Sequence, residues 1–131
     1  MRHNRKQVKL GRTAAHRRAL FRNQLTSLFV HGSIITTAAK AKEVKRRADR
    51  LITWAKEGTL AARRRAAREL FGHEALQELF GRWGPSLDDR DSGYTRTVRI
   101  GPRQGDGAEM MLVEIVGAVP EAGSSEKGAE T

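Results

Sequence analysis

Basic side chains without acidic neighbours are the residues of this sequence best suited to bind a ligand. Residues 1–30 contain eight lysines and arginines and no aspartate or glutamate. A second basic cluster, Arg63-Arg64-Arg65, follows later in the chain. The planar guanidinium group of arginine forms paired hydrogen bonds with phosphate oxygens and also stacks on bases. One arginine cluster alone is typical of a solvated helix face, but the repetition of basic segments predicts a surface that binds a polyanion.

No set of residues has the spacing of a catalytic or metal-binding motif. His73 and the glutamate after it resemble the start of the zinc-protease pattern HExxH, but Gln77 stands where the second histidine is required. The acidic run of residues 88–91 is typical of a solvated loop, and the glycines of residues 101–107 do not follow the pattern of a phosphate-binding loop. We therefore predict that the protein is not an enzyme and uses no metal or cofactor.

The charge is unevenly distributed along the chain. The sequence has 25 Lys+Arg and 15 Asp+Glu, for a net charge of +10. Residues 1–72 carry 19 basic and 4 acidic side chains, a net +15, whereas residues 73–131 carry 6 and 11, a net −5. The basic part repels itself unless a nucleic acid or an anionic membrane neutralises it. A membrane is disfavoured because the apolar stripes of the expected helices face a core, and scarce aromatic residues favour backbone and shape recognition of folded RNA.

Other features of the composition restrict the class of protein. With 131 residues, the chain is long enough for one domain. There is no cysteine, which excludes disulfides and fits a reducing cytosol. We expect no membrane span, because no apolar run approaches about 18 residues, and no secretory signal, because no apolar stretch follows the basic start.

Apolar residues spaced three and four apart predict four helices, over about residues 14–31, 38–57, 60–71 and 73–83. Thr13 and Thr59 are the expected N-caps of the first and third helices. Gly32 and Gly58 are expected to end the first two, and Gly84-Pro85 the fourth. The second helix has the clearest period, and its basic residues share a separate face: Lys42, Arg46 and Arg50.

Short runs of β-branched and apolar residues predict three strands, over residues 33–37, 94–100 and 110–116. The last two read as a hairpin with a long loop. The sequence thus predicts an α+β fold, in which about four helices pack with a small sheet of about three strands. The expected organisation is a basic extended arm, a single RNA-binding domain and a disordered tail, over residues 1–12, 13–117 and 118–131.

Five blocks of residues, in order and at characteristic spacing, carry a resemblance to a known family. They are Met1-Arg2-His3; Gly11 to Leu20 with Arg22-Asn23; Ile35-Thr36-Thr37 with Lys40 to Glu43; Leu51 to Lys56; and Gly93 to Arg96 with Arg103, Gly105-Asp106 and Met110. In these blocks the chain resembles the bacterial large-subunit ribosomal protein seventeen family, from residue 1 to about residue 116.

The resemblance implies a structural constituent of the large ribosomal subunit. Such a protein would bind large-subunit ribosomal RNA beside neighbouring ribosomal proteins, support subunit assembly and translation in the cytoplasm, and lie on the solvent side near the nascent-peptide exit region. The resemblance also implies that residues 34–37 join the hairpin in one sheet, and that Gly93 and Gly105 serve turns. A free-standing RNA- or DNA-binding architectural protein is the alternative, because it would share the basic charge but not the ordered blocks.

The charge pattern and the resemblance together predict the RNA-binding residues. They are Arg2, His3, Arg5, Lys6, Lys9, Arg12, His16, Arg17, Arg18, Arg22, Asn23, Lys40, Lys42, Arg46, Arg50, Arg63, Arg64, Arg96 and Arg103. At Arg96 two interpretations stay open, because this side chain is suited either to contact RNA or to form a cross-strand pair with Glu114.

Overall fold

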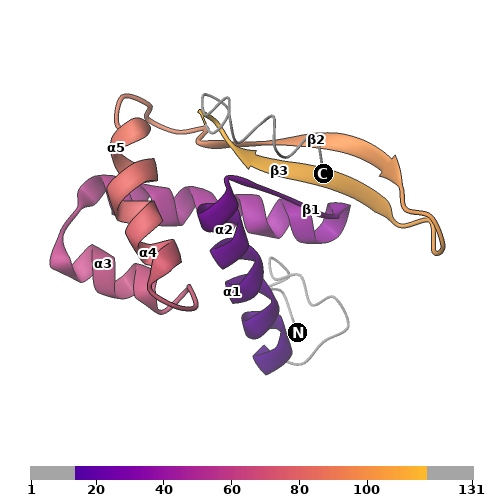
Figure 1. The fold of residues 1–131 in the computed structure, drawn as a ribbon, viewed down its shortest axis with the longest axis horizontal. Coiled ribbons are helices and arrows are strands. Elements are labelled where there is room, and N and C mark those ends of the chain that lie inside the picture. Colours follow the sequence, from indigo (N-terminus) through magenta and orange to yellow (C-terminus); the bar gives the residue numbers. More distant parts are fainter. Residues whose placement is uncertain (1–13, 118–131) are drawn as a thin grey trace, which may run out of the picture.

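The computed structural model describes residues 14–117 (Figure 1). The predictions of a basic arm over residues 1–12, of Thr13 as an N-cap and of a disordered tail over residues 118–131 therefore lie outside the described residues.

The first half of the described chain follows its predicted pattern. Helix α1 spans Ala14–His31 and is followed by strand β1, Ser33–Thr37, and helix α2, Ala38–Glu57. The amide of Gly32 donates to the carbonyl of Leu28, one helical turn back, and ends the helix. Gly32 has a φ of 91°, which residues with a Cβ adopt with difficulty. The predicted bounds of these three elements are confirmed.

Helix α3, Leu60–Ala67, ends four residues earlier than predicted. Its predicted cap is confirmed, because the hydroxyl of Thr59 accepts a hydrogen bond from the amide of residue 62 at 3.0 Å. At the other end, the amides of residues 68 and 69 donate to carbonyls only three residues back, which tightens the last turn. The amide of Phe71 then donates to the hydroxyl of Thr26 on α1 at 2.9 Å. A bond to another helix thus replaces the continuation of α3.

The predicted helix end at Gly84-Pro85 is wrong, because the helix continues past the proline. Three segments follow one another without a break: α4, Glu74–Glu78; the π-helical turn η1, Leu79–Trp83; and α5, Gly84–Ser86. The amide of Gly84 donates to the carbonyl of Leu79, five residues back, and this widened turn carries the chain to Pro85, which has no N–H to donate. A Cβ on Gly84 would lie 3.0 Å from the Cβ of Ala55, so glycine permits the close approach to α2.

Within residues 14–117, the sheet has the predicted three strands. β2 spans Thr95–Pro102 and β3 spans Glu109–Ile115, so both differ from their predicted bounds by one or two residues. The strand order is β1-β3-β2, and both pairs are antiparallel. The loop between β2 and β3 forms the predicted hairpin connection, and the positive φ of Gly93 (70°) and Gly105 (103°) confirms that these glycines serve turns.

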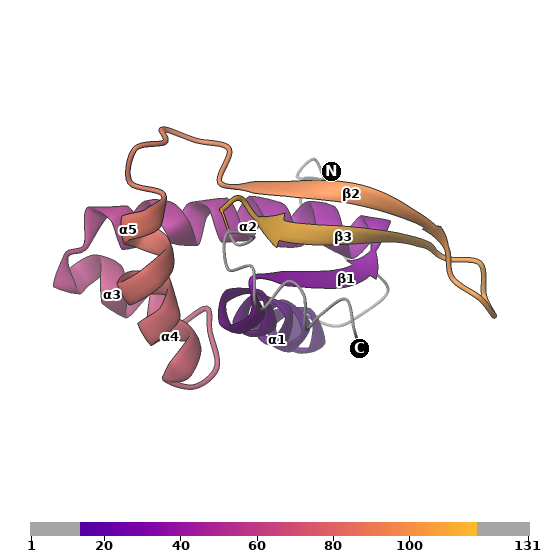
Figure 2. The ribbon, with the colours of Figure 1, turned by 45° about the horizontal axis from the view of Figure 1, so that its top comes forward.

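Helix α2 lies along one face of the sheet, and α3, α4 and α5 gather at the end of α2 that is remote from the hairpin tip (Figures 1 and 2). The core between these layers is formed by apolar side chains from each, including Phe21, Leu28, Leu51, Trp83 and Val113. The predicted α+β fold is confirmed. The hairpin projects beyond α2 in both views, so its outer part rests on no helix of the described chain.

Candidate nucleic-acid interface

Helix α2 presents a basic ridge on the side away from the core. Its inner face buries the predicted apolar stripe: Ala41, Val44, Ala48, Leu51, Ile52 and Ala55. Lys42, Arg46 and Arg50, spaced one turn apart, are all exposed. The helical period therefore places these three cations together on the surface, as predicted.

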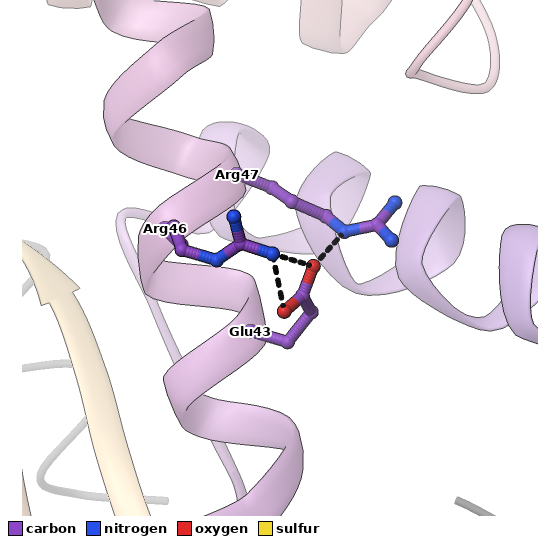
Figure 3. Close-up of polar contacts among 3 residues, drawn as sticks. All are labelled: Glu43, Arg46 and Arg47. Atoms are coloured by element: carbon purple, nitrogen blue, oxygen red, sulfur yellow. Dashed lines mark hydrogen bonds and ion pairs between the residues drawn. The ribbon is translucent and has the colours of Figure 1, made fainter. Parts of the chain in front are cut away.

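A buried carboxylate lies beneath this ridge. The side chain of Glu43 is 6% exposed, and both of its oxygens accept hydrogen bonds from Arg46 at 2.9 Å (Figure 3). Arg47 donates its Nε–H to the same carboxylate at 2.7 Å. Burial alone would raise the pKa of Glu43, but the hydrogen bonds from Arg47 and Arg46 and their positive charges lower it below its ordinary value. Glu43 therefore stays ionised and holds two arginines in place.

Four arginines from distant parts of the chain line one surface depression. It has a volume of about 170 Å³ and joins the first turns of α1, the middle of α2 and the segment after α3. We call it the arginine depression; its lining residues are Ala14, Arg17, Arg18, Arg47, Arg68 and Glu69. Arg17 and Arg18 were predicted site residues, whereas Arg47 and Arg68 were not. Both lie in predicted basic helices, but only the folded chain shows which residues converge.

Most aromatic rings near this surface are covered by the protein's own arginines. The guanidinium carbons lie 4–6 Å from ring centroids in five such pairs: Arg47 over Phe21, Arg22 over Phe71, Arg63 over Phe80, and both Arg50 and Arg65 over Trp54. Such cation–π contacts help to fix the arginine planes, and each guanidinium covers part of a ring. This arrangement fits recognition of an RNA backbone better than stacking of bases.

Arg22 has partners inside the fold. Its terminal nitrogen donates to the carbonyl of Leu70 at 3.0 Å, and its guanidinium lies 4.0 Å from the centroid of the Phe71 ring. Arg22 therefore attaches the segment after α3 to α1. This structural role could not be read from the sequence, since the two segments are 48 residues apart.

The other predicted residues fall into three groups. On α1, His16 and Asn23 are exposed; on the other helices, Arg64 is exposed and Lys40 half-buried. The hairpin carries two more, described below. The rest lie outside the described residues: Arg2, His3, Arg5, Lys6, Lys9 and Arg12.

The arginines of the hairpin are paired with acids. Arg96 and Glu114 lie across the β2–β3 pair with a closest N–O distance of 2.7 Å, so the cross-strand interpretation is confirmed. Arg103 forms two hydrogen bonds with Asp106, at 2.7 and 3.1 Å, which together with the amide of residue 108 hold the pKa of Asp106 far below its ordinary range. Arg99 pairs with Glu109 at 3.3 Å. The three-residue spacing of Arg103 and Asp106 around a turn glycine is the signal that could have predicted that pair.

The described chain offers little for other chemistry. Between residues 14 and 117, no three His, Asp or Glu side chains come together as a metal site would require. None of the helices in this part of the chain is both long enough and apolar enough to cross a bilayer. A second depression has a volume of about 350 Å³, and among its described lining residues only Lys56 and Asp88 are charged.

The fold and its basic helical surface define the class as a small α+β protein suited to bind a polyanion.

Residues 20–116 match the family model described as Ribosomal protein L17. Similar proteins include three named Large ribosomal subunit protein bL17. The protein from Rubrobacter xylanophilus is 49% identical over 116 residues, covering 88% of this chain and 96% of that one. The protein from Carboxydothermus hydrogenoformans is 51% identical over 108 residues, covering 82% and 96%. The protein from Anaeromyxobacter dehalogenans is 50% identical over 114 residues, covering 87% and 70%.

These matches extend over nearly all of the described chain. The chain belongs to the ribosomal protein L17 family, and the resemblance seen in the five sequence blocks is confirmed.

Proposed function

We propose that this chain is a structural constituent of the large ribosomal subunit and binds its ribosomal RNA through the basic surface of α1, α2 and α3. The names of its relatives support the subunit assignment. One observation supports the interface: exposed cations such as Arg18, Lys42 and Arg64 form no ion pair with any described residue, whereas the hairpin arginines do.

The chemistry of this surface suits an RNA backbone. Arginine and lysine neutralise phosphates and release counterions, so affinity falls as salt rises. Binding would relieve the mutual repulsion of the basic helices, and a ligand that binds only the folded state adds to its stability. The protein would therefore stabilise folded RNA and be stabilised by it, which is the behaviour expected of an assembly protein rather than an enzyme.

The finer placement is also part of this proposal. The subunit position would be on the solvent side near the nascent-peptide exit region, in the cytoplasm and next to other large-subunit proteins. The basic residues before residue 13 would contact RNA together with the predicted residues on α1 to α3. The two predicted residues of the hairpin, Arg96 and Arg103, would mainly form their ion pairs.

Association with isolated large subunits tests the proposal and separates it from the free-standing alternative. Tagged protein expressed in a bacterial host should sediment with large subunits through a high-salt wash, and crosslinks to RNA should map to α1, α2 and α3. Loss of the protein from subunits in the wash, with equal recovery on unrelated RNA or DNA, would contradict it and favour a free-standing nucleic-acid binder.

A further inference from the structure

We propose that the arginine depression is a preformed binding site for a single phosphodiester group of the RNA backbone, with Arg47 held ready to donate. This inference rests on the proposed function and goes beyond it, because it distinguishes one anchoring site from the rest of the basic surface. Among the described residues, the depression is lined by Arg17, Arg18, Arg47 and Arg68 and by one acid, Glu69.

Arg47 is fixed before any ligand arrives. Its Nε–H donates to the buried Glu43 carboxylate, and its guanidinium carbon lies 4.6 Å from the centroid of the Phe21 ring. The side chain is 22% exposed. Figure 3 shows its two terminal nitrogens on the side away from Glu43, where they make no hydrogen bond with another described residue. Since less side-chain entropy is lost on binding, a group fixed in this way binds an anion more tightly than a free surface arginine.

The charges around the depression are unbalanced in favour of an anion. Glu43 is already shared between Arg46 and Arg47, and neither Arg18 nor Arg68 forms an ion pair within residues 14–117. Arg18 and Arg68 lie beside Arg47 in the depression and carry the same charge, so the three side chains repel one another. An oxyanion relieves that repulsion through charge-assisted hydrogen bonds.

The size of the depression indicates which anion it accepts. Its volume of about 170 Å³ is below the roughly 300–1,000 Å³ of sites that enclose small-molecule ligands. The described lining residues include no aromatic ring, and Phe21, which contacts Arg47, is fully buried and cannot stack a base. Both features favour one phosphate group over a whole nucleotide.

Two double variants that remove equal charge provide the test. R18Q/R68Q changes two exposed arginines of the depression, and K42Q/R64Q changes two exposed cations elsewhere on α2 and α3. Affinity for deproteinised large-subunit ribosomal RNA is measured for the full chain across a salt series. The site predicts that R18Q/R68Q weakens binding about tenfold more than K42Q/R64Q does, because charge-assisted contacts at a preformed site are lost.

Arg47→Lys tests the geometry at constant charge. It removes the guanidinium fork and the Nε–H, and should weaken RNA binding by about threefold or more. Equal losses for the two double variants, with no effect of Arg47→Lys, would overturn the site but leave RNA binding by the basic surface intact. Affinity that responds to neither double variant nor to salt would instead contradict the proposed function.

Inorganic phosphate, compared with chloride at the same ionic strength, is the second probe. Free phosphate should bind weakly, because a phosphodiester of the RNA is held near the depression by the other contacts of the basic surface, whereas a free ion is not. Tight binding of free phosphate, combined with unchanged RNA affinity of R18Q/R68Q, would assign the depression to a free anion and overturn the inference.

Discussion

The helices and the hairpin of this protein both carry arginines, but they use them differently. On the hairpin, Arg96, Arg99 and Arg103 each face an acid across the strands or the turn. On the helices, basic side chains outnumber acids, and several arginines lie over aromatic rings or line one depression. The hairpin arginines are thus all paired with acids, whereas on the helices only some arginines are paired. Basic side chains that have no acidic partner are the ones expected to attract a polyanion.

Two acids of the helical part show how a few carboxylates direct the surrounding cations. Glu43 is almost fully buried and organises Arg46 and Arg47, and Asp49 accepts hydrogen bonds from Lys45 on its own helix and from Thr95 on β2. These acids stabilise the fold, and of the three ridge cations only Arg46 is paired with one of them. Their removal should consequently disturb the fold as well as the surface.

The largest effect expected from one substitution is at Glu43. Glu43→Gln removes the charge that two arginines share and should lower the free energy of unfolding by about 1.5–3 kcal/mol near neutral pH. The folded-state pKa of Glu43 lies below its ordinary value of 4.5, so its contribution is present above that value and is lost as the pH falls through the lower folded pKa. Denaturant unfolding at several pH values should therefore show the two proteins converging in acid.

Glu57→Gln is the control, because Glu57 forms an exposed ion pair with Arg65. It should change the free energy of unfolding little at any pH. A constant difference between the parent and Glu43→Gln down to strongly acidic pH would contradict the assigned role of Glu43.

Arg22 differs from the exposed arginines of the helical part, because its contacts lie inside the fold and stabilise it. Arg22→Gln should cost about 1–2 kcal/mol of stability, since it loses the bond to the Leu70 carbonyl and the contact with Phe71. Arg18→Gln, one turn earlier and exposed, should change stability by less than about 0.5 kcal/mol. Thermal or denaturant unfolding measures both. Equal costs for the two variants would remove the distinction between internal and surface arginines on α1.

The smallest effect is expected on the hairpin. Arg96→Gln should cost about 0.2–1 kcal/mol, because the pair with Glu114 is a cross-strand contact on an exposed face. The exchange of both charges in R96E/E114R should restore most of that loss. RNA affinity should stay nearly unchanged in both variants, and a marked loss of affinity in Arg96→Gln would show that this arginine contacts RNA.

Local patterns made most of the fold predictable. The bounds of α1, β1 and α2 follow from apolar spacing, a short β-branched run and two glycines, all of which act within a few residues. Where the prediction was wrong, a distant segment decided the outcome. The hydroxyl of Thr26 on α1 accepts the hydrogen bond of the amide that would have extended α3. The π turn before Pro85 is followed by Gly84, which packs closely against Ala55 of α2.

The sequence predicted which residue types form the candidate site, but not how the fold arranges them. The absence of acids before residue 30 and the i, i+4 spacing of Lys42, Arg46 and Arg50 identified a basic surface. Pairing, by contrast, depends on contacts across the fold. The sequence could not show that Arg47 and Arg68 meet Arg18, nor that Arg22 turns inward to the carbonyl of Leu70.

RNA affinity of two triple variants that remove equal charge tests the central claim most directly. One changes Arg18 and Arg64 of the helices and Arg68, which follows α3, to glutamine. The other makes the same change at the hairpin residues Arg96, Arg99 and Arg103. Binding to large-subunit ribosomal RNA is measured over a salt series, with unfolding as the control for fold. The helical variant should lose at least about tenfold in affinity and about 0.7–0.9 of the logarithmic salt slope for each phosphate contact removed, whereas the hairpin variant should keep both nearly unchanged. Equal losses, or a greater loss for the hairpin variant, would contradict the assignment of RNA binding to the helices.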